Sequence, residues 1–222
     1  MKPIATLHTC YPEKFGVPRQ SGLVPSAWGR VEFAPEFQRE EAVRGIEAFS
    51  HLWLITQFHL IDEAESDRVL TVRPPRLGGN ERRGVFATRS PFRPNRLGLS
   101  VVKLERVEAE GPRLWVSGVD LVDGTPIFDI KPYVPYADAL PQATSAFAQE
   151  APPRVNVRWQ IEVSLPADDR AVIDQSISLQ PQPAYQETSD RVYNADIASW
   201  KVRWHMQSGE AVILECTRRT AL

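Results

Sequence analysis

Cysteine is scarce in this sequence: the 222 residues contain only Cys10 and Cys216, at opposite ends of the chain. Neither has a second cysteine two or three residues away, so the chain lacks a thiolate zinc motif and a disulfide framework. We expect both to be structural thiols. The four histidines show neither HExxH spacing nor a cysteine partner, and no metal site is expected.

Long apolar runs are also absent. The most apolar stretch, Phe49–Leu60, is interrupted by polar residues and is far shorter than the roughly 20 residues of a membrane span. The first residues, Met1–Thr6, lack the apolar region of a secretory signal, so a cytoplasmic protein is expected. Without a GxGxxG, Walker lysine or GxSxG motif, the standard nucleotide cradles and the serine-hydrolase elbow are excluded. Irregular loops must then hold any small ligand.

Acidic residues are nearly missing from one segment. Between Arg68 and Arg96 the sequence has eight arginines and one acid, Glu81, which gives +7 there and −9 elsewhere for a net charge of −2. Such a concentrated cationic segment is typical of a local contact with a polyanion. Alternatively, these arginines pair with acids elsewhere in the fold, and charge alone leaves both interpretations open.

Helical periodicity is limited to Phe37–Ala48, where Gly45 weakens it. Short alternating segments separated by turn residues dominate instead, and they favour an all-β fold, a barrel or a sandwich. The expected strands are His51–His59, Arg68–Arg73, Gly84–Thr88, Leu99–Val107, Arg113–Leu121, Ile127–Ile130 and Val155–Ser164.

The composition changes at Ala137–Pro153, which is rich in alanine, proline and glutamine and predicts a domain boundary or a connecting crossover. We expect an all-β domain over residues 1–150 and a small mixed α/β domain over residues 151–222. The second domain should hold a short helix at Pro166–Ser176 and a strand pair, Ile197–Met206 and Ala211–Glu215, joined through Ser208-Gly209.

The first segment with chemical content is a loop, Glu13–Leu23, which brings Pro18, Arg19 and Gln20 together. An arginine fork and an amide on a proline-stiffened turn can bind a carboxylate and the edge of a purine. An ordinary N-terminal turn is the alternative.

The second segment, Thr71–Ser100, sets arginines between prolines and glycines, so the loops lose little conformational entropy on binding. Phe86 and Phe92 can stack a base, since arginines interleaved with aromatic residues are typical of single-stranded RNA surfaces. The alternative is that both rings belong to the core, which the expected strand favours for Phe86.

The third segment, Val119–Tyr133, contains a tight Asp123-Gly124 turn. After it, Asp129, Lys131 and Tyr133 alternate along an extended stretch and should point to one face. An acid, an amine and a phenol together can handle a proton or orient a substrate. An Asp–Lys ion pair explains the same pattern.

Taken together, these segments resemble one family, the TsaA-like or YaeB proteins called TrmO, which are tRNA N6-threonylcarbamoyladenosine methyltransferases. The resemblance rests on KFGVPRQ, AVRGIEAFSHLW, VRPPRLGGN, GVFATRSPFRPN, DLVDGTP and DIKPY, which occur in the family's order and cover roughly residues 1–150. The tail resembles the bacterial form through Gln182–Tyr185 and Trp200–Trp204. Three positions depart from the family pattern: Leu60, Arg96 and Gln182.

The resemblance implies a single-sheet β-barrel that binds S-adenosylmethionine, in a homodimer with part of each site near the subunit interface. It implies that arginine binds the methionyl carboxylate, that Asp123 binds the ammonium, and that backbone groups bind the adenine edge. The implied cofactor positions are Pro18, Arg19, Gln20, His59, Leu60, Arg89, Leu99, Val122, Asp123, Gly124 and Thr125.

The implied reaction is N6-methylation of N6-threonylcarbamoyladenosine at position 37 of a tRNA. In this hypothesis Asp129 or Tyr133 assists proton removal and Lys131 stabilises negative charge. A non-catalytic RNA-binding β-module and a methyltransferase with a small-molecule acceptor remain as alternatives. The residues expected to hold the anticodon arm are Arg73, Arg76, Arg82, Arg83, Arg93, Arg96, Lys201, Arg203, Arg218 and Arg219.

Overall fold

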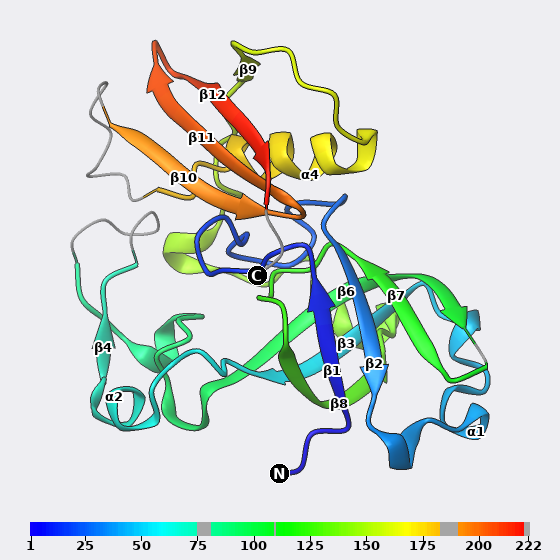
Figure 1. Cartoon of the computed structure of the whole chain (residues 1–222). Helices are drawn as coiled ribbons and strands as arrows, with labels where there is room; N and C mark the ends of the chain where they lie inside the picture. The colour runs from blue at the N-terminus through cyan, green and yellow to red at the C-terminus, as the bar shows by residue number, and fades with distance from the viewer. Residues whose placement is uncertain (75–80, 109, 183–190, 220–222) are drawn as a thin grey trace. The chain divides into compact units, whose positions relative to one another are not determined.

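The computed structural model of the chain describes residues 1–74, 81–108, 110–182 and 191–219 (Figure 1). Strands make up most of its regular structure, so the all-β prediction is confirmed. The strands are β1 (Ala5–Thr9), β2 (Trp28–Phe33), β3 (His51–Gln57), β4 (Thr71–Val72), β5 (Arg83–Gly84), β6 (Leu97–Glu108), β7 (Arg113–Ser117), β8 (Thr125–Pro132), β9 (Val157–Trp159), β10 (Val192–Ile197), β11 (Trp200–Gln207) and β12 (Glu210–Arg218).

Helices are short, with one exception, the 12-residue α4. The α-helices are α1 (Glu40–Val43), α2 (Glu63–Arg68), α3 (Pro135–Asp138) and α4 (Ala167–Ser178), and the 3₁₀ helices are η1 (Pro35–Phe37), η2 (Ile46–Ala48), η3 (Val85–Ala87), η4 (Pro94–Arg96) and η5 (Ala146–Ala148). Across the described ranges, none of these helices has the length and apolar character needed to span a membrane.

Six strands close into a barrel in the order β1-β2-β7-β6-β3-β8 (Figure 1). Burial alternates along β3 as expected: Leu52 and Leu54 are fully buried, whereas Trp53 and Ile55, which follow them in turn, are partly exposed. Because successive side chains of a strand face opposite sides, the buried set fills the barrel interior. The interior is lined by Ala5, Leu7, Val31, Phe33, Leu52, Leu54, Val102, Leu114, Val116 and Ile127.

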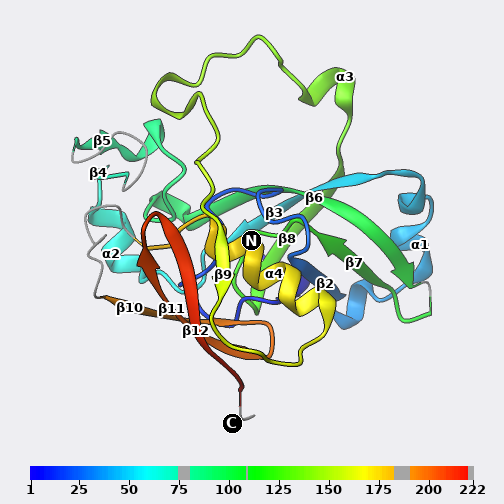
Figure 2. The ribbon, with the colours of Figure 1, turned by 90° about the horizontal axis from the view of Figure 1, so that it is seen from above.

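The C-terminal strands form a separate mixed sheet in the order β10-β11-β12-β9, with β9 parallel to β12 and the other pairs antiparallel. Figure 2 shows α4 running beside this sheet. Two indole nitrogens tie the helix to it: Trp159 Nε1 donates to Asp174 at 2.6 Å, and Trp200 Nε1 donates to Asp169 at 2.8 Å. The expected small mixed α/β domain is therefore present.

Contacts between Cα atoms divide the chain into two compact units that do not follow the sequence order. The first consists of Met1–Leu7, Arg30–Val116 and Gly124–Ala151, and the second of His8–Gly29, Ser117–Asp123 and Pro152–Leu222. The second unit therefore gathers an N-terminal loop and a short internal segment around the C-terminal sheet. The predicted domain border at residue 150 stays a prediction.

Some expected elements differ from the structure. The helix expected at Phe37–Ala48 is broken because Gly45 adopts a left-handed conformation, φ +85°, which leaves only the short helices on either side. The strand expected at Gly84–Thr88 is wrong, since residues 85–87 form the 3₁₀ turn η3. Most of Arg68–Arg73 lies outside a strand, because α2 extends to Arg68 and β4 has only two residues.

Candidate functional site

One rim of the barrel gathers predicted cofactor residues of the first unit. Strand β3 runs antiparallel to both β6 and β8, so its end lies beside the beginnings of these two strands. Thr56 pairs with Gly98 on one side and with Ile127 on the other. His59 follows β3 and Gly124 precedes β8, and both therefore belong to this rim.

Two glycines let the backbone approach closely at this rim. A Cβ on Gly98 would lie 2.6 Å from Thr56 Oγ1, too close for any side chain. Gly124 has φ +78°, a conformation that favours glycine, and a Cβ there would lie 4.0 Å from His59 Nε2. Leu99 is 59% exposed at the start of β6, and Leu60 is also exposed, whereas Thr125 is buried. The rim thus presents an imidazole, a glycine turn and apolar surface next to one another.

The predicted catalytic residues lie on the outer face of the barrel. The strand register sets Asp129 opposite Ile55, which on its other side lies opposite Leu99. Lys131 lies opposite Trp53, two residues along the same face. Both charged side chains are exposed, and within the described residues no ion pair joins them. The alternative of an Asp–Lys pair is therefore wrong, and the carboxylate and amine face solvent.

Tyr133 follows the end of β8 on that same face. Its ring centroid lies 5.9 Å from that of Trp53 and 6.3 Å from that of His51. Trp53 in turn donates from Nε1 to Asp138, which also accepts from the backbone nitrogen of Val134. These two bonds, that from Val134 first, lower the pKa of Asp138 below its ordinary value. The phenol is thus packed against aromatic rings, and Asp129 and Lys131 are more open.

In the second unit, the loop with Pro18, Arg19 and Gln20 is held by a contact between two glycines. Gly22 N donates to the carbonyl of Gly118 at 2.8 Å, and a Cβ on Gly118 would lie only 3.3 Å from Gly22 Cα. Pro18 is buried and Arg19 is exposed, while the Gln20 amide donates to the Arg19 carbonyl. The loop is therefore anchored at its proline and presents its arginine to solvent.

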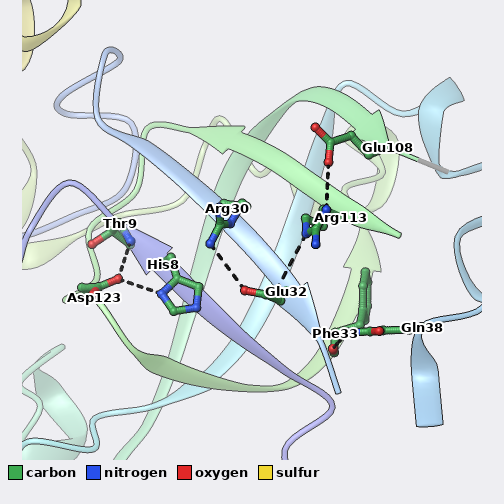
Figure 3. A network of polar contacts seen from close by, with 9 residues as sticks. All are labelled: His8, Thr9, Arg30, Glu32, Phe33, Gln38, Glu108, Arg113 and Asp123. Atoms are coloured by element: carbon green, nitrogen blue, oxygen red, sulfur yellow. Dashed lines mark hydrogen bonds and ion pairs between the residues drawn. The ribbon is translucent and has the colours of Figure 1, made fainter. Parts of the chain in front are cut away.

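Asp123 belongs to the same unit and is fixed through one oxygen. Its Oδ1 accepts from Thr9 N at 2.9 Å and lies 3.2 Å from His8 Nδ1 (Figure 3). The Asp123 nitrogen donates to the carbonyl of Tyr11, and half-buried Val122 precedes it. Within the part of the chain that the structure describes, Oδ2 has no partner. The second oxygen can accept a bond from a cationic ligand.

Two arginines of the cationic segment bind backbone carbonyls of the protein. Arg93 donates to the carbonyls of Thr88 and Ser90, and Arg96 donates to the carbonyl of Ile61 at 3.0 Å with only 16% of its side chain exposed. Their guanidinium groups therefore hold the loop together. The family pattern has an apolar residue or proline at this position, and the φ of +52° at Arg96 is a backbone conformation that proline cannot adopt.

The other described arginines of the segment lie further outward. Arg73, Arg82 and Arg89 are exposed, and Arg82 donates to Thr71 Oγ1 at 2.8 Å. Arg83 is partly exposed, pairs with Glu81 at 2.6 Å, and lies over the ring of Phe147. Arg76, another predicted RNA contact, lies outside the described residues.

Phe86 corrects an expectation. The expected strand favoured a core position, yet the side chain of Phe86 is 79% exposed at the middle of η3. Its neighbour Val85 is buried instead, because the turn reverses which residue faces inward. Phe92 is only partly exposed.

The tail residues predicted to contact RNA lie on or beside the outer face of the C-terminal sheet. Lys201, Arg203, Arg218 and Arg219 are exposed. Arg203 pairs with Glu215 at 2.7 Å and Arg219 pairs with Asp196 at 3.0 Å. Gln182, the other departure from the family pattern, is buried in the second unit.

Sequence reasoning missed a charged network on the barrel wall. Arg30 contacts Glu32, and Arg113 joins Glu32 to Glu108 (Figure 3). Trp115 lies among these groups and donates to Glu108 at 2.9 Å, which is the main reason that the pKa of Glu108 is lowered. The charges alternate between neighbouring strands, a pattern that appears only once the pairing of β2, β7 and β6 is known.

Both cysteines are buried, as expected of structural thiols. Burial raises the pKa of Cys10 to about 12 and that of Cys216 to about 11, so both stay protonated near neutral pH. Tyr11, beside Cys10, also has a raised pKa because it is buried, and its hydroxyl lies 3.0 Å from Ser176 Oγ.

Two models of one protein family match the chain. The tRNA-methyltransferase O N-terminal domain matches residues 6–139, and the TrmO C-terminal domain matches residues 160–219. The chain is also similar to a crystal structure of TrmO from Pseudomonas aeruginosa, with a TM-score of 0.79 and 35% sequence identity, over 97% of this chain and 96% of that one.

Curated relatives agree. A putative S-adenosylmethionine-dependent methyltransferase RcsF from Pseudomonas aeruginosa is 44% identical over 215 residues, 92% of this chain and 91% of that protein. The tRNA (adenine(37)-N6)-methyltransferase of Escherichia coli strain K12 is 42% identical over 216 residues, 91% of each chain. Since the N-terminal model alone covers more than half of the sequence, this chain belongs to the tRNA-methyltransferase O family.

Proposed function

We propose that this chain is an enzyme that transfers the methyl group of S-adenosylmethionine to N6 of adenine 37 in tRNA. The observation that carries the proposal is the match to both domains of tRNA-methyltransferase O, together with 42% identity along 91% of the chain to a protein named for this reaction. The missing dinucleotide and P-loop motifs agree with it, because a cofactor on this barrel must be held by loops.

The proposed cofactor residues have chemistry that suits S-adenosylmethionine. The free Oδ2 of Asp123 suits the methionyl ammonium, and exposed Arg19 or Arg89 suits the carboxylate. Leu99 offers exposed apolar surface to the adenine, and the turn of residues 122–125 offers backbone groups. When bound, the cofactor supplies an electrophilic methyl group on a sulfonium.

We further propose that the acceptor is N6-threonylcarbamoyladenosine within the anticodon arm. In this nucleoside N6 is part of a urea, whose carbonyl withdraws electron density and makes the N6 proton easier to remove than that of a simple amine. The new N–C bond forms as the S–C bond breaks, and the N6 proton passes to a base of the protein. The chain must therefore place the two partners in line and accept one proton.

Asp129 is the proposed base. Its carboxylate lies on the outer face two strands from Leu99, about 10 Å across the sheet at the usual strand spacing. Tyr133 is packed against His51 and Trp53, which suits a residue that orients the acceptor. Lys131, exposed on the same face, stabilises negative charge on the urea carbonyl or the threonyl carboxylate.

Single-turnover methylation tests these roles. Asp129→Asn should lower the rate constant by about 100-fold, within the usual range for general-base assistance. Lys131→Met and Tyr133→Phe should lower it less. Cofactor affinity measured by calorimetry should stay unchanged in all three variants, which separates chemistry from binding. Undiminished rates in all three would remove these residues from the reaction.

Nucleoside mass analysis tests the function itself. tRNA that carries N6-threonylcarbamoyladenosine is incubated with the protein and S-adenosylmethionine, and should gain one methyl group on that nucleoside. The matched control is the same tRNA with unmodified adenosine 37, which should gain none if the urea is needed. Cofactor binding without methyl transfer to any tRNA would favour a small-molecule acceptor, and no cofactor binding would favour an RNA-binding module.

We also propose a homodimer and a role for residues 151–222 in holding tRNA. Sedimentation should give the mass of a dimer. Lys201→Ala should weaken tRNA binding without changing the affinity for S-adenosylmethionine, because Lys201 is exposed on β11. Arg203→Ala should have a smaller effect, since Glu215 already neutralises that guanidinium.

A further inference from the structure

Phe86 is exposed on a turn that has a defined shape. Val85, the residue before it, is buried, and its nitrogen donates to the carbonyl of Leu70 at 3.1 Å. The Val85 carbonyl accepts from both the nitrogen and the hydroxyl of Thr88, at 3.2 and 3.0 Å. These bonds hold the turn, so the ring projects outward from an anchored backbone and is ready for a partner at low entropic cost.

The surroundings of this ring are cationic. Strand β5 leads directly into the turn and pairs with β4, where Val72 lies opposite Arg83 and Thr71 opposite Gly84. Exposed Arg73 directly follows β4 and exposed Arg82 directly precedes β5, and Arg82 donates to Thr71 Oγ1. Glu81 is the only acid in the sequence between Arg68 and Arg96, and it pairs with Arg83.

An exposed aromatic ring on a cationic segment matches one ligand class. RNA offers phosphates to the guanidinium groups, and each unpaired base offers a flat face to the ring. An apolar protein partner would bury a broad surface with few charges, whereas here exposed Arg73 directly follows β4 and exposed Arg82 directly precedes β5, the strand that leads into the turn of Phe86. The charge and the aromatic surface point to the same occupant.

We propose that Phe86 stacks on an unpaired base of the RNA substrate while Arg73 and Arg82 contact its phosphates. This inference rests on the proposed function for the identity of the RNA, an anticodon stem–loop. It assigns Phe86 to substrate positioning, since the ring itself contains no group that exchanges a proton.

The test compares substitutions of Phe86 in the full-length protein. Phe86→Ala should raise the dissociation constant for tRNA, measured by gel shift at fixed salt, by about 10-fold or more, as expected for the loss of one stacked base. Phe86→Leu should behave like alanine, because it keeps apolar surface without a ring, and Phe86→Trp should restore binding. Affinity for S-adenosylmethionine and the unfolding temperature should stay unchanged, because the ring is exposed.

Tyr136→Ala is the matched control, because Tyr136 is 93% exposed and lies on α3, away in sequence from the cationic segment. It should bind tRNA like the wild type. A hairpin RNA with 2-aminopurine in its loop gives a direct readout: the wild type and Phe86→Trp should quench its fluorescence, and Phe86→Ala should quench it less.

Three results would overturn the inference: wild-type tRNA affinity in Phe86→Ala, equal affinity of the leucine and tryptophan variants, or a change of oligomeric state in Phe86→Ala, which would mean that the ring packs against a second copy of the chain. Failure of the proposed function looks different. In that case the wild type binds tRNA and responds to Phe86 substitutions, but transfers no methyl group.

Discussion

Arg96 and Arg89 lie seven residues apart in the same cationic segment, yet the surroundings of their side chains differ. Arg96 turns its guanidinium onto the carbonyl of Ile61 and is mostly buried, as Arg93 turns onto the carbonyls of Thr88 and Ser90. Arg89 and Arg73 are exposed. A run of like charges is therefore not one surface: Arg93 and Arg96 stabilise the loop, whereas Arg73 and Arg89 are exposed.

The largest expected effect concerns the exposed arginines, Arg73 and Arg89. Arg89→Ala should weaken binding of S-adenosylmethionine by about 100-fold, because a charge-assisted bond to the cofactor carboxylate would be lost while the carboxylate stays desolvated. Calorimetry measures the affinity, and Arg73→Ala is the control, expected to stay within about twofold of the wild type. If Arg89→Ala weakens tRNA binding instead, Arg89 belongs with the RNA-contacting arginines.

The arginines that bind backbone carbonyls, Arg93 and Arg96, should contribute to the free energy of unfolding. Arg96→Ala should lower the free energy of unfolding by about 2 kcal/mol, because the buried Ile61 carbonyl loses a charged donor. Its contact with Glu63 adds little, since that carboxylate is exposed. Urea unfolding followed by far-ultraviolet circular dichroism measures the change. Arg73→Ala should stay within about 0.5 kcal/mol of the wild type, because Arg73 is exposed, and equal losses in both variants would abolish the distinction.

Most of the barrel was predictable because its signal is local. The alternation in His51–His59 predicted β3. In the separate C-terminal sheet, Ser208-Gly209 likewise predicted the hairpin of β11 and β12. The turn at Phe86 was not predictable in the same way. Val85 and Phe86 suit a strand equally well, and the bond from Val85 to the backbone of Leu70 decides which of the two faces inward.

The sequence predicted which residues belong to the candidate site, but it did not predict how they are arranged in space. The motifs identified Asp123 and Arg19, but the bond from Thr9 to Asp123 joins residues 114 positions apart. The contact between Gly22 and Gly118 also joins residues far apart in the sequence. The residue types gave no sign of these contacts, because threonine and glycine occur at many positions of the chain that do not make such contacts. Such contacts depend on which distant segments the fold brings together, and a local sequence pattern does not contain that information.

Salt dependence separates the two groups of arginines by a smaller effect. If Arg73 contacts a phosphate, Arg73→Ala should reduce the slope of log K against log salt concentration by roughly 0.7 for single-stranded RNA. Arg93→Ala should leave the slope unchanged even where it lowers stability, since its guanidinium is bound to backbone carbonyls. Gel shifts at four or more salt concentrations give the slopes, and a reduced slope for Arg93→Ala would place that residue on the RNA.

An acid, Asp138, also binds groups of the protein itself, and its substitution should have the smallest effect on the free energy of unfolding. Asp138 accepts from Val134 N and Trp53 Nε1, and these bonds lower its pKa. A carboxyl whose pKa is lower in the folded state stabilises the fold above its unfolded pKa of about 3.9 and loses that contribution as the pH falls through the folded value.

The stability difference between the wild type and Asp138→Asn should therefore be constant from pH 5 to pH 7 and shrink below about pH 4, where the wild-type carboxyl becomes protonated. Because Asp138 is exposed at the surface, the difference should be small. Urea midpoints measured across this range test it. A difference that persists unchanged at pH 3 would mean that the asparagine side chain itself destabilises the fold. The charge of Asp138 would then contribute nothing to holding Trp53.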